Sequence, residues 1–397
     1  MMAFPVKWYA SQMQGAPSLG DTSAGALTSL LKAVLVTGFG TLTINSLVWD
    51  AAENAAKATI AGGHAYLQDS VVEVSGASPA AYNGEHRAKK VSSTEVWFEL
   101  DGGNPGSAGS GAMSMKVAPL GWTLTHESGD GMVAIYRPTN VSESGNISLR
   151  IDNTAFSGWT GATYRAYLAK VQLVEDVVDI NTYTLIADYR WPATKRYSDG
   201  RWDLIGDGQL FYFLPAYASP NFQTLLMFGY IKSVRPGDRY HAVLGTYPVT
   251  SSDDSTRRWD QATTANWSYV YNNLLNFDDS NHRAMARPYH QLFGAVSWWL
   301  KGVFSRFGTG VTVPNGSDNG FYMSTDPIMV MESNNHLRGY LPGLVVPYGN
   351  VSAWHRKNFA NLPALPGKIV RFIQATYNES GANAPTLAGF DLTGPWR

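Results

Sequence analysis

The chain has 397 residues, a formal net charge of −1 and no cysteine. The lack of cysteine excludes disulfides, zinc–thiolate sites and thiol nucleophiles, and no basic block is long enough to follow a phosphate backbone, so nucleic acid is not an expected partner. Hydrophobic residues make up 44% and charged residues only 15%. This weakly charged composition favours a surface covered by neighbouring subunits or by uncharged polar residues.

The first 45 residues are expected to form an arm and a short helix. Residues 5–19 are polar and interrupted by Gly and Pro, which indicates an extended arm. Leucine and valine then recur at three- and four-residue spacing, which predicts a helix over about 23–36 that ends before Gly38. Residues 1–10 lack the apolar core of a secretory signal, and the apolar stretch 33–36 is too short to cross a bilayer, so no membrane insertion is expected.

Residues 46–118 are predicted to form a small inserted β-barrel module. Short runs such as "AKATIA", "SVVEVSG" and "TEVWFEL" are separated by turn-forming sequence such as "SGASPAAYNG". Five such strands in about sixty residues favour a closed sheet over an open one with long edges.

Residues 119–397 are predicted to form one large β-sandwich-like body. Strand-like runs rich in aromatic and β-branched residues continue through this region, for example "RWDLIGDGQLFYFLPAY" and "KIVRFIQATY", and no helical spacing persists after Val36. A polar stretch over 251–279 is expected to be a long excursion. The expected fold is therefore mainly β, with a β-sandwich-like body, a small inserted β-barrel and a short N-terminal helix.

Several segments occur in an order that suggests a family. These are "VKWYASQMQGAPSLGDTSAGALTSLLKAVLVTGFG", "VVEVSGASPAAYNGEHRAKKV", "VAPLGWT" with "VAIYRP", and "LRGYLPGLVVPYGN". With them the chain resembles a family of virion structural proteins of tailed bacteriophages. The resemblance implies a packing part of the particle, at the tail tip or baseplate, that is assembled in the host cytoplasm with other virion proteins and copies of itself. It brings no catalytic motif and no cofactor.

A packing role needs apolar side chains that dock on a neighbour. The arm and the helix are expected to supply them, because burying aromatic side chains between subunits is favourable and the short helix is marginal alone. Of the adjacent tryptophans 298 and 299, one would face the core and the other could face a partner. The residues expected at such interfaces are Phe4, Trp8, Tyr9, Leu27, Leu31, Trp298 and Trp299.

Two alternatives remain open from the sequence. The chain could be a host-surface binding module that contacts a glycan through the loops 251–279 and 315–320, with Trp191, Trp202 and Trp259 as a sugar platform. It could instead be a glycosidase that uses Asp203 and Asp207, whose even spacing puts both carboxylates on one face of an extended strand. The sequence "GDG" around Asp207 is equally typical of a turn.

No metal site is expected. His282 and His290 lie eight residues apart without a recognised ligand spacing, and they are interpreted as polar loop residues. The stretch "NGSDNG" at 315–320 is rich in oxygen ligands, but it lacks the length and the terminal Glu of a calcium loop and is interpreted as a turn.

Overall fold

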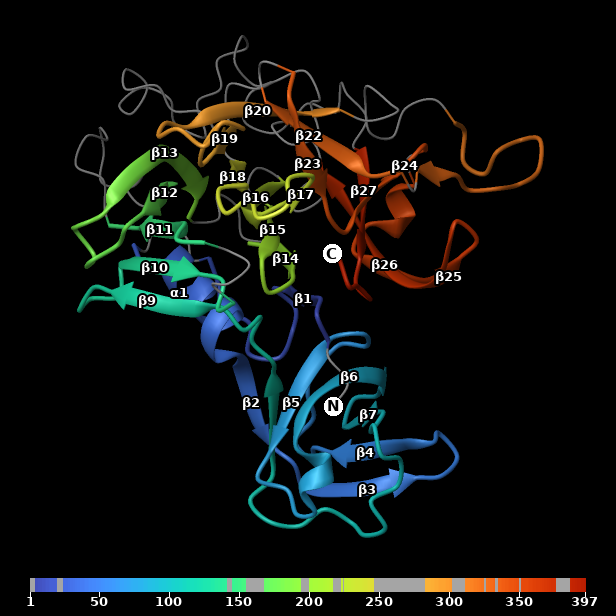
Figure 1. Cartoon of the computed structure of the whole chain (residues 1–397). Helices are drawn as coiled ribbons and strands as arrows, with labels where there is room; N and C mark the ends of the chain where they lie inside the picture. The colour runs from blue at the N-terminus through green and yellow to red at the C-terminus, as the bar shows by residue number, and fades with distance from the viewer. Residues whose placement is uncertain are drawn as a thin grey trace.

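A computed structural model describes most of the chain, and it is mainly β with one short helix, which confirms the expected fold class (Figure 1). Strands hold 47% of the residues and helical turns 6%. The described residues are 4–19, 24–140, 145–154, 168–193, 200–216, 223, 225–245, 283–301, 311–324, 326–332, 335–349, 351–375 and 386–397.

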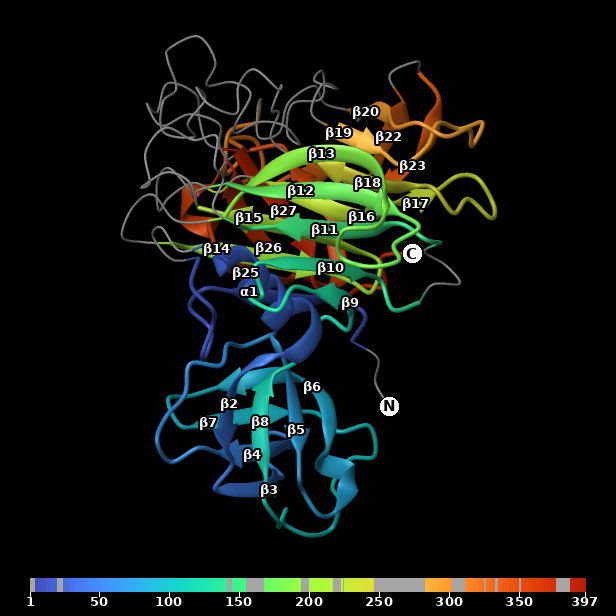
Figure 2. The same ribbon diagram turned by 90° about the vertical axis from the view of Figure 1, so that its left-hand side faces the viewer.

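A seven-stranded sheet forms the lower lobe in Figures 1 and 2. Its strands are β2 (Phe39–Thr43), β3 (Ser46–Asp50), β4 (Ala55–Thr59), β5 (Val71–Ser75), β6 (Gly84–Val91), β7 (Glu95–Phe98) and β8 (Ser114–Val117). Their order is β2-β8-β5-β6-β7-β4-β3, so the two edge strands are consecutive in the chain. The sheet therefore curls, and the short connection between β2 and β3 joins its two edges. It begins at Phe39, earlier than the expected module at 46, because β2 pairs with β8.

A ten-stranded antiparallel sheet is the middle layer of the upper lobe. Its strands are β1 (Lys7–Ala10), β14 (Trp202–Gly206), β15 (Leu210–Pro215), β16 (Leu226–Tyr230), β17 (Lys232–Ser233), β18 (Ala242–Gly245), β19 (Arg283–Met285), β20 (Val296–Lys301), β22 (Ile328–Glu332) and β23 (Leu337–Leu341). Their order is β1-β14-β15-β16-β18-β19-β20-β22-β23-β17. β16 is the fourth strand in this order and β17 is the last. Because β17 follows β16 almost directly in the chain, the far end of the sheet comes back close to its fourth strand.

Two five-stranded sheets complete the upper lobe. The first has the order β13-β12-β11-β10-β9 and the second the order β21-β24-β27-β26-β25. Their strands are β9 (Thr123–Glu127), β10 (Val133–Arg137), β11 (Ser148–Asp152), β12 (Leu168–Glu175), β13 (Thr184–Pro192), β21 (Met323–Ser324), β24 (Leu344–Pro347), β25 (Lys357–Leu362), β26 (Leu365–Ala375) and β27 (Thr386–Asp391).

Strand β15 explains how the three layers pack. All six of its residues are buried, and successive side chains point to opposite faces of the sheet. The ring of Phe211 lies 5.3 Å from that of Trp122, which directly precedes β9. The ring of Tyr212 lies 5.4 Å from that of Phe390 in β27. An apolar run without alternation is what a strand covered on both faces requires, and the body has one layer more than a simple sandwich.

The expected helix is confirmed as α1 (Ala26–Lys32), which continues as a π-helical turn over Ala33–Thr37. Its apolar side chains are buried inside the chain, next to the β9–β13 sheet (Figure 2). Three contacts fix it there: Asn153 Oδ1 accepts the Leu27 N–H at 2.9 Å, Tyr136 donates to the Thr28 carbonyl at 3.0 Å, and Lys32 pairs with Glu127 at 2.7 Å. The helix therefore belongs to the upper lobe.

The expected arm is also part of the upper lobe, because β1 pairs antiparallel with β14 in register from Lys7–Gly206 to Ala10–Asp203. The same segment touches the lower lobe. The Lys7 ammonium pairs with Glu85 of β6 at 2.5 Å, and Gly15 lies directly against Gly40 of β2. The N-terminal segment thus joins the two lobes.

Replacing Gly40 tests this junction. Gly40 has φ +70°, and a Cβ there would overlap the Gln14 carbonyl. We expect Gly40→Ala to lower the free energy of unfolding by at least about 2 kcal/mol, from the left-handed backbone and the clash together. Gly62→Ala is the control, since a Cβ at Gly62 meets nothing within 4 Å. Urea unfolding of both variants measures the two losses. Equal stabilities would contradict the close approach of the backbone at Gly40 to that at Gln14.

Candidate functional site

The residues expected to dock on a neighbouring subunit lie mostly inside the chain, which corrects that assignment. Trp8, Tyr9, Leu27, Leu31 and Trp298 are each at most 2% exposed. Their partners are intramolecular: the Tyr9 hydroxyl, for example, donates to the Ala118 carbonyl, and Trp298 Nε1 donates to the Ala284 carbonyl.

The two other interface candidates are less informative. Phe4 is half-buried with the Arg87 guanidinium 5.5 Å from its ring centre, so it too packs against its own chain. Trp299 lies in β20, and its side chain is outside the described part of the structure. The apolar side chains of the arm and the helix named above are therefore not available for an interface with a neighbouring subunit.

The expected sugar platform is corrected in the same way. Trp191 and Trp202 are fully buried, and their indole N–H groups donate to the carbonyls of Gly245 and Pro17. Trp259 and the loop 251–279 lie outside the described residues. The segment 315–320 is the expected turn, closed by the Asn315 N–H on the Gly320 carbonyl at 2.9 Å.

Asp203 and Asp207 do not form the carboxylate pair of a glycosidase. Asp203 is fully buried in β14, with Arg371 Nη2 2.6 Å from its Oδ1 and Arg356 Nε 3.0 Å from its Oδ2. Asp207 lies in the turn between β14 and β15. One of its oxygens accepts the backbone N–H groups of the two residues that follow Gly208, each at 2.8 Å. Both carboxylates hold the fold, and the turn interpretation of Asp207 is confirmed.

The histidines offer no metal site in the part of the chain that the structure describes. His290 is exposed in the loop after β19, with its ring against Tyr289, and His282 lies outside the described residues. Among the described residues no cluster of three or more potential metal ligands is present.

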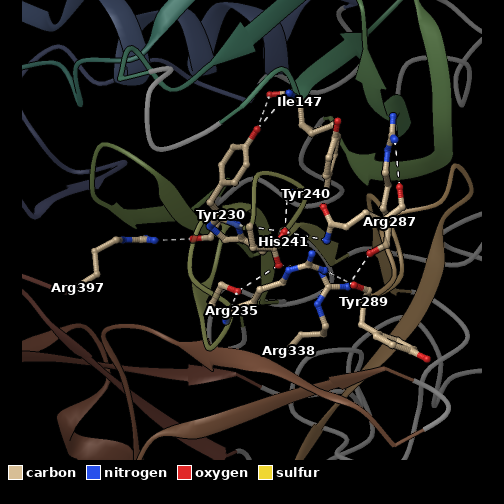
Figure 3. Close-up of polar contacts among 12 residues, drawn as sticks. Ile147, Tyr230, Arg235, Tyr240, His241, Arg287, Tyr289, Arg338 and Arg397 are labelled. Atoms are coloured by element: carbon tan, nitrogen blue, oxygen red, sulfur yellow. Dashed lines mark hydrogen bonds and ion pairs between the residues drawn. The ribbon is translucent and has the colours of Figure 1, made fainter.

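A cleft of about 740 Å³ lies beside β16 and β17. Residues 231–241 supply eight of its ten lining residues, the turn after β14 supplies one, and the last residue of the sequence supplies another. Figure 3 shows Arg235, His241 and Arg397 of this lining. Its lining residues are Gln209, Ile231, Lys232, Ser233, Arg235, Gly237, Asp238, Arg239, His241 and Arg397. Four cationic side chains and one carboxylate line the cleft, and although Arg397 among the cations pairs with Asp207, the lining keeps an excess of positive charge. We call it the basic cleft.

Two buried polar atoms, on residues that line the basic cleft, have no hydrogen-bond partner among the described residues. They are Gln209 Oε1 and His241 Nδ1, both on buried residues. The Gln209 amide is held from its other end, where Nε2 donates to the Asn140 carbonyl at 3.3 Å. Burial lowers the pKa of His241 to about 4, so its imidazole is neutral at pH 7.

An ion network holds Asp238, which is part of the wall of the basic cleft. Arg338 of β23 lies between two carboxylates, 2.9 Å from Asp238 and 2.6 Å from Glu332, and its guanidinium also donates to the Arg287 carbonyl at 2.6 Å. Arg287 in turn pairs with Glu175 at 2.8 Å. Burial of Asp238 opposes its ionisation most strongly, but the hydrogen bonds from Arg338 and from the Tyr240 backbone, together with the charge of Arg338, outweigh it and keep the pKa of that carboxyl below its ordinary value.

Exposed apolar side chains lie beside this network. Leu292 is 67% exposed and Phe293 64%. Direct contacts place the group together: the Val234 N–H donates to the Arg338 carbonyl, the Tyr289 ring lies 4.2 Å from that of His336, and Phe293 lies 5.7 Å from the Arg287 guanidinium. We call this group the apolar rim, and it consists of Val234, Tyr289, Leu292, Phe293 and Leu337.

Sequence reasoning missed both features. The wall of the basic cleft is the stretch "KSVRPGDRY", in which three cations surround a Pro-Gly turn, and that local signal was available. The rim residues Leu292 and Phe293 lie in "HQLF", and their exposure has no signature in the sequence. Gln209 and Arg397 could not be joined to these residues without the strand order.

The role of Asp203 can be tested by comparing a buried and an exposed ion pair. Asp203→Ala leaves the Arg371 guanidinium buried and unpaired, which should cost about 3–5 kcal/mol of unfolding free energy. Glu99→Ala breaks an exposed pair with Lys89 and should cost less than about 1 kcal/mol. Denaturant unfolding measures both values, and similar small losses would show that Asp203 does not hold the layers together.

The neutral His241 predicts a loss of stability in acid. Its pKa is below the ordinary value of 6.5 in the folded chain, so the unfolded chain takes up the proton first as the pH falls from about 6.5 to 4. Between pH 7.5 and 5 this should cost up to about 2 kcal/mol. We expect His241→Gln to flatten the fall in melting temperature, while His290→Gln, at an exposed position, follows the wild type. Parallel curves for all three proteins would contradict the buried neutral imidazole.

Comparisons with known proteins add no family to this geometry. No protein-family description matches the chain, and no curated protein is significantly similar to it. Among the described residues, no helix has both the length and the apolar character needed to cross a membrane. A function must therefore be argued from the surface features described above.

Proposed function

We propose that the chain is a structural subunit of a tailed-bacteriophage virion, at the tail tip or baseplate, and that it packs against another virion subunit through the apolar rim. The resemblance of the sequence segments to phage virion proteins supports the assignment to a virion. The apolar rim supports packing against another subunit as the mode of action. The observation that carries the proposal is the clustering of five of the eight exposed large hydrophobic side chains of the described residues beside one ion network.

The composition of the apolar rim suits a protein interface. Exposed apolar patches bordered by polar residues are typical of such sites, and aromatic residues and arginine are enriched in them. The rim borders Arg235 and Arg287, whose guanidinium groups are held by the Tyr289 carbonyl and by Glu175. Burying Leu292 and Phe293 would contribute about 1.5–3 kcal/mol each before the ordering costs of association. Repetition around a symmetric ring multiplies such contacts.

A second candidate function is binding to the host surface, and the basic cleft favours it. Pockets that bind small ligands are concave and hold a few convergent polar groups, as this cleft does. Such binding needs no catalysis, which agrees with the engaged carboxylates of Asp203 and Asp207.

The main proposal is tested on purified particles. We expect the chain to be found by mass spectrometry in particles that band at constant density, and the double variant Leu292→Ser, Phe293→Ser to be incorporated at least tenfold less. Tyr322→Ser is the matched control, because Tyr322 is 42% exposed but is not part of the rim.

The outcomes separate the two parts of the proposal. If the chain is missing from purified particles, the virion assignment fails. If the double variant keeps its melting temperature and is incorporated like the wild type, the rim is not the packing surface.

A further inference from the structure

We propose that the apolar rim packs against the end of the β12–β13 hairpin of a second copy of this chain. The inference names the partner of the rim, so it rests on the packing mode of the proposed function. It is tested on the purified full chain, whereas the proposed function is tested on particles, so the two fail separately.

The first argument is the charge around the apolar rim. The rim is carried by three short segments, 232–238, 287–293 and 336–338. They contain one carboxylate, Asp238, whose side chain has no exposed surface and is paired with Arg338. Lys232 and Arg235, by contrast, are exposed, and neither has an ion-pair partner in the described part of the chain. The Arg235 guanidinium donates to the Tyr289 carbonyl, a neutral group (Figure 3). The rim therefore presents apolar side chains beside positive charge that is not neutralised.

The second argument is that hydrogen bonds hold these segments in place before a partner arrives. The Gln291 side chain donates to one oxygen of Asp238 at 3.3 Å, and the Ser233 hydroxyl donates to the other at 3.1 Å. Because successive side chains of a strand alternate, Lys232 and Val234 then lie together on the face opposite Ser233. A surface that is fixed in this way loses little conformational freedom on association.

The third argument is a patch of opposite charge on the same chain. The β12–β13 hairpin exposes Val178 by 71% and Leu185 by 46%. Asp176 and Asp179 of its turn are also exposed, and neither carboxylate has an ion-pair partner among the described residues. We call these four residues the acidic tip. Apolar side chains beside unpaired carboxylates are complementary to the apolar rim in both respects.

The distribution of exposed apolar side chains favours a second copy as the partner. The rim and the acidic tip together hold seven of the eight exposed large hydrophobic side chains of the described residues. The eighth, Tyr322, donates its hydroxyl to Asp318 within its own turn. The acidic tip is held against its own sheet, since Arg150 of β11 donates to the Ile180 carbonyl at 3.1 Å. Two complementary patches on one chain are what a symmetric assembly of identical subunits requires.

An anionic membrane fits the rim less well. Segments that bind anionic lipids carry clusters of about four to eight lysines and arginines. Among the described residues of the rim segments, only Lys232 and Arg235 are exposed cations without a carboxylate partner or a turn to the cleft wall. The acidic tip would also have no role in such binding.

The experiment is sedimentation velocity of the full chain at about 1 to 100 µM, which covers dissociation constants typical of weak subunit contacts. We expect reversible self-association. Raising NaCl from about 0.05 to 0.5 M should raise the dissociation constant about threefold or more, because salt screens the charges of the two patches.

Charge reversals assign the association to the two patches. Lys232→Glu and Asp176→Lys should each raise the dissociation constant about tenfold or more, because each places like charges opposite one another. An equimolar mixture of these two variants should recover the wild-type affinity, since every contact between rim and tip again joins opposite charges. Lys357→Glu, at an exposed lysine of β25 outside both patches, is the matched control and should associate like the wild type.

A further variant tests the apolar part without affecting the fold. Val178→Ser changes a side chain that is mostly exposed, so its melting temperature should equal that of the wild type while self-association weakens. The same comparison of melting temperatures is made for Asp176→Lys, because Asp176 has φ +52° and lysine adopts that conformation at some cost.

The outcomes separate this inference from the proposed function. A chain that stays monomeric, or a mixture of the two reversals that does not recover, overturns the pairing of rim and tip. If the rim variants still fail to enter particles in that case, packing through the rim stands with a different virion protein as partner. Binding of a monomeric chain to phosphatidylserine vesicles would overturn the inference in favour of a membrane. Self-association by a chain that is missing from particles would keep the inference and refute the virion assignment.

Discussion

The buried charge of Asp203 is the constraint on which the upper lobe depends. It sits in β14, a strand whose residues are all buried, and a carboxylate there is tolerated only with close cationic partners. Arg371 supplies the nearest of these from the long strand β26, and its guanidinium also lies 4.1 Å from the ring of Trp8 in β1. One ion pair thus connects the N-terminal strand, the middle sheet and the C-terminal sheet. The middle sheet and the C-terminal sheet cannot shift against one another without separating these charges.

The layered arrangement also explains why large aromatic residues are buried. A middle sheet covered on both faces needs large apolar side chains on both, and β15 provides phenylalanines toward one neighbour and Tyr212 toward the other. The tryptophans fill these layers while their N–H groups donate to backbone carbonyls, which is the usual solution for a buried indole. An aromatic-rich composition that suggested intermolecular contacts therefore serves mainly the interior. The apolar rim is what remains exposed on the described surface.

Local sequence patterns were sufficient to predict the helices and strands, but they were insufficient to predict contacts between distant segments. The helix followed from the spacing of its leucines, and the strands of the lower lobe followed from alternation and turn residues, because both depend on neighbours within a few positions. Whether Trp191 or Trp202 faced solvent depended on sheets formed by distant segments. The partner of Asp203 lies 168 positions away, so the carboxylate could equally have been catalytic when read alone. The basic cleft likewise unites a turn, a loop and the last residue, which only the strand order brings together.

The pairing of β1 with β14 sets an order of events during synthesis. Residues 7–10 leave the ribosome well before their strand partner, which lies at 203–206. At a translation rate of 5–20 residues per second, the N-terminal strand waits roughly 10–40 s for its partner. The lower lobe, whose strands all lie between Phe39 and Val117, can close in that interval. Until β14 emerges, the edge of β1 and the side chain of Trp8 are open to other chains or to a chaperone.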